Sequence, residues 1–292
     1  MAAWHIGIIG GSGLYEPGAL DEMQEIAVAS AFGAPSGPVT TGTIGGHRFT
    51  FIARHGPAHA LSPTHVNYRA NIDVLKRCGV TDVLAISAVG SLREEIAPGQ
   101  FAGVSQFIDR TIARERSFFG DGIVAHVPLA DPVCPRLSGM AREAFAQAGG
   151  SVHEGATYVA IEGPQFSTRA ESRLLREWGA DVIGMTAMPE ARLAREAELP
   201  YALIGMVTDY DCWREEDADV DVAQIMAVMH ANAQTARAAL VQLAALLPAE
   251  RPASPIDTVL DTAIVTPRDA WADTAAARLD AVAKRLLRNT IA

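Results

Sequence analysis

The sequence alternates short apolar runs with amphipathic segments, and this alternation constrains the fold more than any other feature. Runs rich in Val, Ile and Phe are followed by segments whose apolar residues recur at helical spacing. Chains of this kind pack helices against a sheet, so we expect an α/β fold: a single domain with a central mixed β-sheet flanked by helices. The predicted strands are 5–11, 82–91, 100–109, 155–164, 180–186 and 201–210, and the predicted helices are 65–77, 135–150, 169–179, 189–199 and 221–247.

Turn and breaker residues divide the rest of the chain. Residues 41–56 resemble two strands joined through Gly45 and Gly46, a pattern that is typical of a β-hairpin. Beyond residue 247 the segment 248–255 is rich in Pro and Ala and is typical of a linker, and a terminal helix is expected over about 274–288. We therefore expect one domain over 1–247, followed by a linker and C-terminal helical extension over 248–292.

Composition narrows the classes of partner. Of the 292 residues, 49% are hydrophobic, yet no apolar run approaches the roughly 18 residues that span a bilayer. The start carries no Lys or Arg before its short apolar stretch, unlike a secretory signal, so a cytoplasmic protein is expected. The net charge of −10, without a Lys/Arg-rich run, argues against nucleic acid. With nucleic acid disfavoured, a small molecule or another protein is the expected partner. Three widely spaced cysteines assemble neither a disulfide framework nor a zinc motif.

The first strand ends in a glycine-rich turn. Backbone amides of residues 10–13, with the Ser12 hydroxyl, could hold an anion, although such turns also occur without a ligand. A dinucleotide fingerprint requires a helix directly after the glycines, whereas Pro17 and Gly18 follow here, so NAD binding is disfavoured.

Further polar groups follow other predicted strands, where ligands of α/β sheets bind. Arg54 and His55 leave the strand that precedes them together, and an arginine fork suits a phosphate; a solvated Arg beside a partly buried His is the alternative. Ser87 with Ala88 and Met185 with Thr186 end two more strands and offer small donors. His55, His59 and His65 lack the spacing and carboxylates of a metal site, so no metal is expected.

The sharpest signal is the pair Asp209 and Asp211, which follow a buried strand one residue apart. Ionised carboxylates only accept hydrogen bonds, and a 6-aminopurine offers two donors: its exocyclic amine, and N7 once protonated as the glycosidic bond breaks. An exposed acidic loop is the alternative. Phe166 could stack on such a base or pack in the core, and Glu162 with Arg169 could form a structural ion pair.

These motifs together resemble the methylthioadenosine phosphorylase family of the purine nucleoside phosphorylase superfamily, over nearly the whole chain to about residue 247. The motifs that carry the resemblance are "IGIIGGSGL", "ARHGPAH" with "VNYRANI", "SAVGSLREEI", "SQFIDRT", "IEGPQFSTRAES", "ADVIGMTAMPE" and "TDYDCW". The resemblance implies reversible phosphorolysis of 5′-methylthioadenosine to adenine and 5-methylthioribose 1-phosphate. Phosphate is then a co-substrate and no cofactor is needed.

The resemblance also implies roles for individual residues. The implied phosphate site comprises Ser12, Arg54, His55, Ser87, Ala88 and Thr186. The implied catalytic set is Asp209, Asp211, Ser167 and Val222, and the implied substrate contacts are Met185, Phe166, Asp209, Asp211, Val222, Ile225, Met226 and His126. The apolar stripe at 222, 225 and 226 would line a methylthio pocket or simply be helix core. His126 would come from a neighbouring subunit, which implies a homotrimer or a dimer of trimers.

Other functions stay open on sequence alone. A methylthioinosine or general purine nucleoside phosphorylase is one alternative, although a carboxylate facing a 6-oxo group would be repulsive. A hydrolytic nucleosidase would have no need for the arginine fork at Arg54, and a non-catalytic nucleoside-binding protein would show no phosphate-dependent turnover. The chain departs from many relatives of the family in carrying Ser12 and Ser87 in place of Thr, and in its longer tail beyond Pro248.

Overall fold

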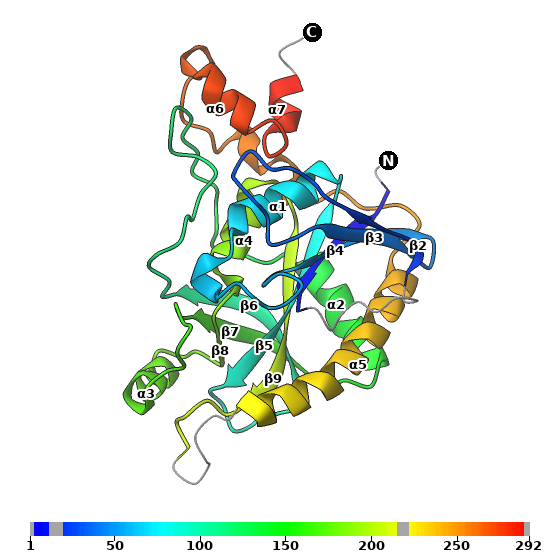
Figure 1. Cartoon of the computed structure of the whole chain (residues 1–292), viewed down its shortest axis with the longest axis vertical. Helices are drawn as coiled ribbons and strands as arrows, with labels where there is room; N and C mark the ends of the chain where they lie inside the picture. The colour runs from blue at the N-terminus through cyan, green and yellow to red at the C-terminus, as the bar shows by residue number, and fades with distance from the viewer. Residues whose placement is uncertain (1–2, 12–19, 215–221, 289–292) are drawn as a thin grey trace.

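A computed structural model describes residues 3–11, 20–214 and 222–288, and of 222–227 and 288 the backbone only. In this part of the chain a mixed sheet runs in the order β2-β3-β4-β1-β5-β8-β7-β6-β9, and β9 also pairs with β5, so strands β5 to β9 close on themselves (Figure 1). The strands are β1 (His5–Gly10), β2 (Asp21–Ile26), β3 (Val39–Ile44), β4 (His47–Ala53), β5 (Asp82–Ser91), β6 (Phe101–Asp109), β7 (Val152–Ala160), β8 (Val182–Gly184) and β9 (Tyr201–Asp209).

Helices cover both faces of this sheet (Figure 1). Side chains alternate along each central strand, as a pleated strand requires. The helices are α1 (Tyr68–Arg77), α2 (Pro135–Gln147), α3 (Arg169–Glu177), α4 (Ala187–Glu196), α5 (Val222–Leu246), α6 (Asp273–Arg278) and α7 (Lys284–Arg288), with 3-10 turns η2 (Pro63–His65), η3 (Pro255–Asp261) and η4 (Arg268–Ala270). In β9, Tyr201 and Leu203 pack with α1 and α4, whereas Ala202 and Ile204 pack with α2 and α5.

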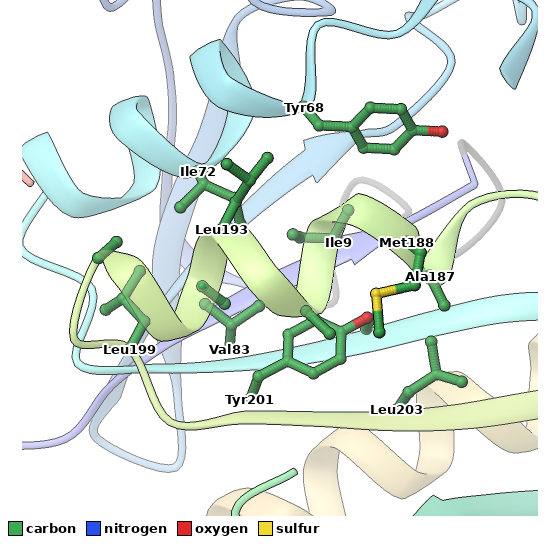
Figure 2. Packing of buried hydrophobic residues seen from close by; sticks show 14 of the residues in the cluster. Ile9, Tyr68, Ile72, Val83, Ala187, Met188, Leu193, Leu199, Tyr201 and Leu203 are labelled. Carbon is green, nitrogen blue, oxygen red and sulfur yellow. The ribbon is translucent and has the colours of Figure 1, made fainter. Parts of the chain in front are cut away.

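The layer of α1 and α4 is the one that fixes the ligand-binding edge. Figure 2 shows Ile72 of α1 and Leu193 of α4 facing each other above Val83 of β5 and Tyr201 of β9. All four side chains are almost fully buried. Burial of apolar surface stabilises a fold by about 25 cal/mol per Å², so this layer holds α4 firmly against the strands. The residues at the start of α4 therefore have a fixed position relative to the sheet.

The α/β fold and its elements agree with the sequence prediction. Gly45 and Gly46 have φ of 56° and 82° and form the tight turn between β3 and β4, as the hairpin motif indicates. The edge strand β2 was not predicted, because its residues are exposed throughout and lack apolar alternation. Its pairing with β3 is carried by backbone hydrogen bonds.

The C-terminal segment packs against the body of the protein. Residues of η3 and α6, among them Leu260 and Leu279, belong to the same apolar cluster as α1 and α4. In the predicted linker, Arg251 is buried and pairs with Asp82 at 2.5 Å. The helix predicted over 274–288 is wrong as one element, since residues 279–283 separate α6 from α7. No helix in the described ranges is long and apolar enough to cross a membrane.

Candidate active site

One edge of β5 is open midway along the strand. β1 pairs with β5 only as far as Ala85, and β8 pairs with it from Gly90, so among the described strands residues 86–89 have a partner on the β9 side alone. Ser87 and Ala88 lie in this gap. The prediction that they end their strand is wrong, because β5 continues to Ser91 to pair with β8. The gap nonetheless leaves their backbone accessible on one side.

The start of α4 brings a second hydroxyl to this gap. Thr186 is the residue that precedes α4, and its Oγ1 lies 3.2 Å from the Ser87 Oγ. Its backbone N–H donates to the Tyr158 hydroxyl at 3.3 Å, which fixes the turn. Both hydroxyls are nearly buried, so they form a small polar site in an otherwise apolar surrounding. Two sequence-predicted donors from segments 99 residues apart are thereby brought together.

Arg54 lies below this gap and is fully buried. Its Nε and Nη2 donate to the Glu190 carboxylate of α4 at 2.9 and 3.0 Å, and the Tyr201 hydroxyl donates to the same carboxylate at 2.9 Å. Burial alone would lower the pKa of Arg54, but Glu190 raises it above its usual range. The bidentate edge of the guanidinium is therefore bound to Glu190, and a phosphate would meet only the remaining N–H groups of Arg54.

The remaining donors of Arg54 are limited. Nη2 also lies 3.4 Å from the Ile9 carbonyl and Nη1 3.3 Å from the Ile86 carbonyl. Of five N–H groups these bonds use four, which leaves one on Nη1 for a ligand within the described structure. Arg54 can thus hold an anion through a single hydrogen bond and its charge, while Glu190 keeps it in place.

His55 stands next to Arg54 as a neutral ring. Its Nδ1 lies 2.8 Å from the Leu61 carbonyl, and a carbonyl only accepts, so Nδ1 carries the proton. Burial, with the positive charge of Arg54, lowers the pKa of His55 to about 4. Its ring stacks on His59 at 4.3 Å. No group of three or more His, Cys, Asp or Glu side chains in the described ranges could hold a metal ion.

The loop after β7 lies against the segment after β8. Gly163 has a φ of 67°, and a side chain there would meet the Met185 sulfur at 2.5 Å, so only glycine lets the two segments approach. Phe166 is 48% exposed, which excludes the core-packing alternative. The Ser167 carbonyl accepts from the Cys212 thiol at 3.1 Å, which connects this loop to the turn after β9.

The same loop is held by a charged network that sequence reasoning missed. Glu162 pairs with Arg114 at 3.0 Å, in place of the suggested Arg169. It also accepts from the backbone N–H groups of Ile112 and Ala113 and from the Thr64 hydroxyl. Burial would raise the pKa of Glu162, but these hydrogen bonds outweigh it and lower the pKa to about 2.

Asp209 and Asp211 lie at the end of β9, beside Gly90 of β5. A side chain at position 90 would meet Asp209 Oδ1 at 2.9 Å, so the glycine makes room for the pair. Burial raises the pKa of both carboxyls, and for Asp211 the charge of Asp209 adds to the rise. The alternative of an exposed acidic loop is wrong for these two, since Asp211 is only 8% exposed.

Strand register sets the distance between the two ends of the site. Gly205 of β9 is opposite Ser87, and Asp209 is opposite Gly90. Ser87 and Gly90 are three residue steps apart, which at about 3.3 Å per step is roughly 10 Å of strand, and the pairing with β9 shifts register between Val89 and Gly90. The hydroxyl pair and the carboxylate pair therefore lie beside two positions of β5 that are three steps apart.

Several predicted residues cannot be placed in this arrangement. Ser12 lies outside the described residues, and nothing is described of the side chains of Val222, Ile225 and Met226 at the start of α5. His126 is exposed, and its backbone N–H donates to the Ala263 carbonyl at 2.8 Å. Their proposed roles stay predictions.

Comparison with known proteins agrees with the geometry. A sequence profile of the phosphorylase superfamily matches residues 5–245. An S-methyl-5′-thioadenosine phosphorylase of Cereibacter sphaeroides is 52% identical over 97% of this chain and 98% of its own, and one of Bradyrhizobium diazoefficiens is 50% identical over the same shares. The chain belongs to the methylthioadenosine phosphorylase family of the phosphorylase superfamily. The resemblance seen in the sequence motifs is confirmed.

Solved structures of this family have the same fold. A methylthioadenosine phosphorylase from an antarctic soil metagenomic library matches 96% of this chain and 99% of its own, with a TM-score of 0.91 and 44% identity. A Schistosoma mansoni methylthioadenosine phosphorylase in complex with adenine matches 96% of this chain and 98% of its own, with a TM-score of 0.81 and 34% identity.

Proposed function

We propose that the protein cleaves 5′-methylthioadenosine with phosphate, giving adenine and 5-methylthioribose 1-phosphate. The observation that carries this proposal is the register of β5 and β9, with the Ser87 and Thr186 hydroxyls at one end and Asp209 and Asp211 at the other. A ribose between them would have phosphate on one side and base on the other. The names of the relatives, which share about half their residues with this chain, support the same substrate.

At the base end of this proposal, Asp209 faces N7, and Asp209 and Asp211 together face the exocyclic amine. Phosphate attacks the anomeric carbon as the bond to N9 breaks, the electron pair goes to the base, and the protonated carboxyl of Asp209 gives its proton to N7. Burial raises the pKa of Asp209, which favours the protonated form that this step requires. Phe166, half exposed beside them with Ser167, stacks on the purine.

At the phosphate end, the donors are the Ser87 and Thr186 hydroxyls, the Ala88 backbone and the one available N–H of Arg54. His55 has its proton on Nδ1, so its Nε2 accepts from a protonated phosphate oxygen. Ser12 contributes from the glycine-rich turn, and the backbone N–H of Arg54 donates to the Gly10 carbonyl just before Ser12 at 2.9 Å. Buried donors of this kind favour a transition state with charge on phosphate.

The sugar and its 5′ group lie between the base end and the phosphate end in this proposal. Met185 contacts the ribose, and Val222, Ile225 and Met226 line the methylthio pocket with His126 from a neighbouring subunit. The working unit is then a homotrimer or a dimer of trimers, acting in the cytoplasm. Inorganic phosphate is a co-substrate, and the reaction takes no cofactor.

The experiment that tests this function measures base release with and without phosphate. Adenine from methylthioadenosine is compared with hypoxanthine from methylthioinosine and inosine. Phosphate-dependent adenine release is expected. Release without phosphate identifies a nucleosidase, preferential hypoxanthine release contradicts the roles of Asp209 and Asp211, and no release from any substrate contradicts the proposal as a whole.

A further inference from the structure

We infer that Arg114 is a positioning residue that holds the base-side loop and the phosphate-side turn in fixed register. The inference rests on the proposed function, because it assigns the two segments to the two ends of one substrate. Arg114 lies between them with its side chain almost completely buried. Because its N–H groups donate to protein acceptors, its effect is exerted through the residues that it binds.

The guanidinium of Arg114 reaches both segments at once. Its Nη2 donates to the Glu162 carbonyl at 2.7 Å, and its Nε to the Glu162 carboxylate at 3.0 Å, both in the loop after β7. Its Nη1 donates to the carbonyls of Met185 at 2.5 Å and Met188 at 2.8 Å, on either side of Thr186. One planar group thus fixes the backbone on both sides of the site.

All five N–H groups of Arg114 are used within the protein. Beyond the bonds above, Nη1 lies 3.1 Å from the Tyr68 hydroxyl, and Nη2 3.5 Å from the Ile161 carbonyl. The Tyr68 hydroxyl donates to the Pro63 carbonyl at 2.9 Å, so its oxygen is an acceptor towards Arg114. No donor is left for a phosphate, which separates the role of Arg114 from that of a ligand-binding arginine.

The segments that Arg114 joins carry the proposed substrate contacts. The loop that begins at Glu162 leads to Phe166 and Ser167, and the turn at 185–188 contains Met185 and Thr186. Neither segment is part of a long strand at this point, since β7 ends at Ala160 and β8 at Gly184. A backbone hydrogen bond from Ile161 N–H to the Gly184 carbonyl at 2.9 Å joins the two segments where the strands end. Beyond it, the Arg114 side chain binds both segments.

A matched control exists at the opposite end of the sheet. Arg251 is 8% exposed, as is Arg114, and it also binds carboxylates, Asp82 and Asp257, and a backbone carbonyl. Asp82 begins β5, whereas the site lies towards the end of that strand. Loss of Arg251 therefore removes a similar buried network without touching the substrate-binding segments.

The test compares Arg114→Gln, Arg114→Lys and Arg251→Gln with the parent. Each is measured for its thermal midpoint and for kcat and KM towards phosphate and methylthioadenosine. A misplacement of about 1 Å can cost 10²-fold in rate. At a temperature where the variant is folded, we expect Arg114→Gln to lower kcat/KM for both substrates by about 10- to 100-fold. Arg114→Lys keeps hydrogen-bond donors at this position and should recover part of the loss.

The control gives the outcome that overturns the inference. Arg251→Gln is expected to lower the thermal midpoint and leave kcat/KM of the folded enzyme within about twofold. If both Arg114 variants behave like Arg251→Gln, Arg114 is structural only and the inference is wrong. If Arg114→Gln does not fold, the thermal midpoint and kcat/KM of Arg114→Lys alone are compared with those of Arg251→Gln. A parent without phosphate-dependent adenine release contradicts the proposed function itself, and this result does not depend on any variant.

Discussion

Asp209 and Asp211 are joined by a hydrogen bond inside their own turn: Oδ1 of Asp209 accepts the backbone N–H of Asp211 at 2.8 Å. The Thr208 hydroxyl lies 2.6 Å from the other oxygen, Oδ2. Asp211 has a φ of 53°, a left-handed conformation that is costly for a residue other than glycine. This hydrogen bond stabilises the turn and orients the Asp209 carboxyl relative to the backbone of Asp211, so we treat the two residues as one base-reading unit.

Asp209→Asn tests this unit with little change in shape. The Asn oxygen still accepts from Asp211 N–H, while its NH₂ cannot give up a proton to N7 and presents a donor that suits a 6-oxo group. We expect kcat/KM for methylthioadenosine to fall by about 10²- to 10⁴-fold, as for loss of a general acid, and the relative preference for methylthioinosine to rise. The exposed Asp21→Asn of β2 is the control. An unchanged ratio of the two substrates would remove the base-reading role from Asp209.

The sequence predicts those parts of the fold that depend on local pattern. The buried run of β9, its ending at Asp209, and the glycine turn at Gly45 and Gly46 are all local signals, and the structure confirms them. The gathering of polar residues at strand ends also follows from strand direction alone. In this way the sequence places Ser87 and Thr186 near each other, and the structure brings their hydroxyls within 3.2 Å, although Ser87 lies within its strand rather than at its end.

Partners distant in sequence could not be predicted. Glu190 was not singled out, because in the sequence it is one of several acidic residues of an amphipathic helix, and Arg54 is 136 residues away. Arg114 is one of three arginines within residues 110–116, and only the tertiary structure shows which of them is buried between two loops. Arg54 follows directly after a predicted buried strand, and a buried arginine needs a carboxylate partner. This requirement could have prompted a search for Glu190.

Phe166→Ala tests stacking on the base. The side chain is 48% exposed, so its removal should change the thermal midpoint by less than about 2 °C. Stacking of a base on an aromatic ring is worth about 1–3 kcal/mol, so KM for methylthioadenosine should rise by about 5- to 150-fold while KM for phosphate stays the same. Leu174→Ala, an exposed apolar residue of α3, is the control. Equal effects of the two substitutions on KM would contradict stacking.

Glu190→Gln tests the buried pair below the phosphate end. Glu190 and Arg54 are each 2% exposed, and the substitution leaves the arginine charge without its counterion. Breaking a buried pair in this way costs about 3–5 kcal/mol, so the free energy of unfolding in urea should fall by that amount. Tyr201→Phe removes only one hydrogen bond to the same carboxylate and should cost about 1–2 kcal/mol. The explanation fails if Tyr201→Phe is the more damaging of the two.

Glu196 gives a pH dependence of stability that can be measured apart from activity. Its carboxylate is 7% exposed and accepts from the Ser117 hydroxyl and the Phe118 N–H, each at 2.7 Å. Burial is the larger effect and raises the pKa of Glu196 from 4.5 to about 7. In the folded protein the protonated form is therefore favoured, whereas in the unfolded chain the carboxyl ionises near its ordinary pKa.

The sign of the effect follows from proton binding. Between pH 4.5 and 7 the folded protein holds a proton that the unfolded chain has released, so the free energy of unfolding falls as pH rises through this range. A pKa difference of this size is worth up to about 3 kcal/mol. Gln cannot titrate, so the stability of Glu196→Gln relative to the parent should increase from pH 4.5 to 7 and then level off in urea unfolding at each pH. A constant difference between Glu196→Gln and the parent across this range would contradict the raised pKa of Glu196.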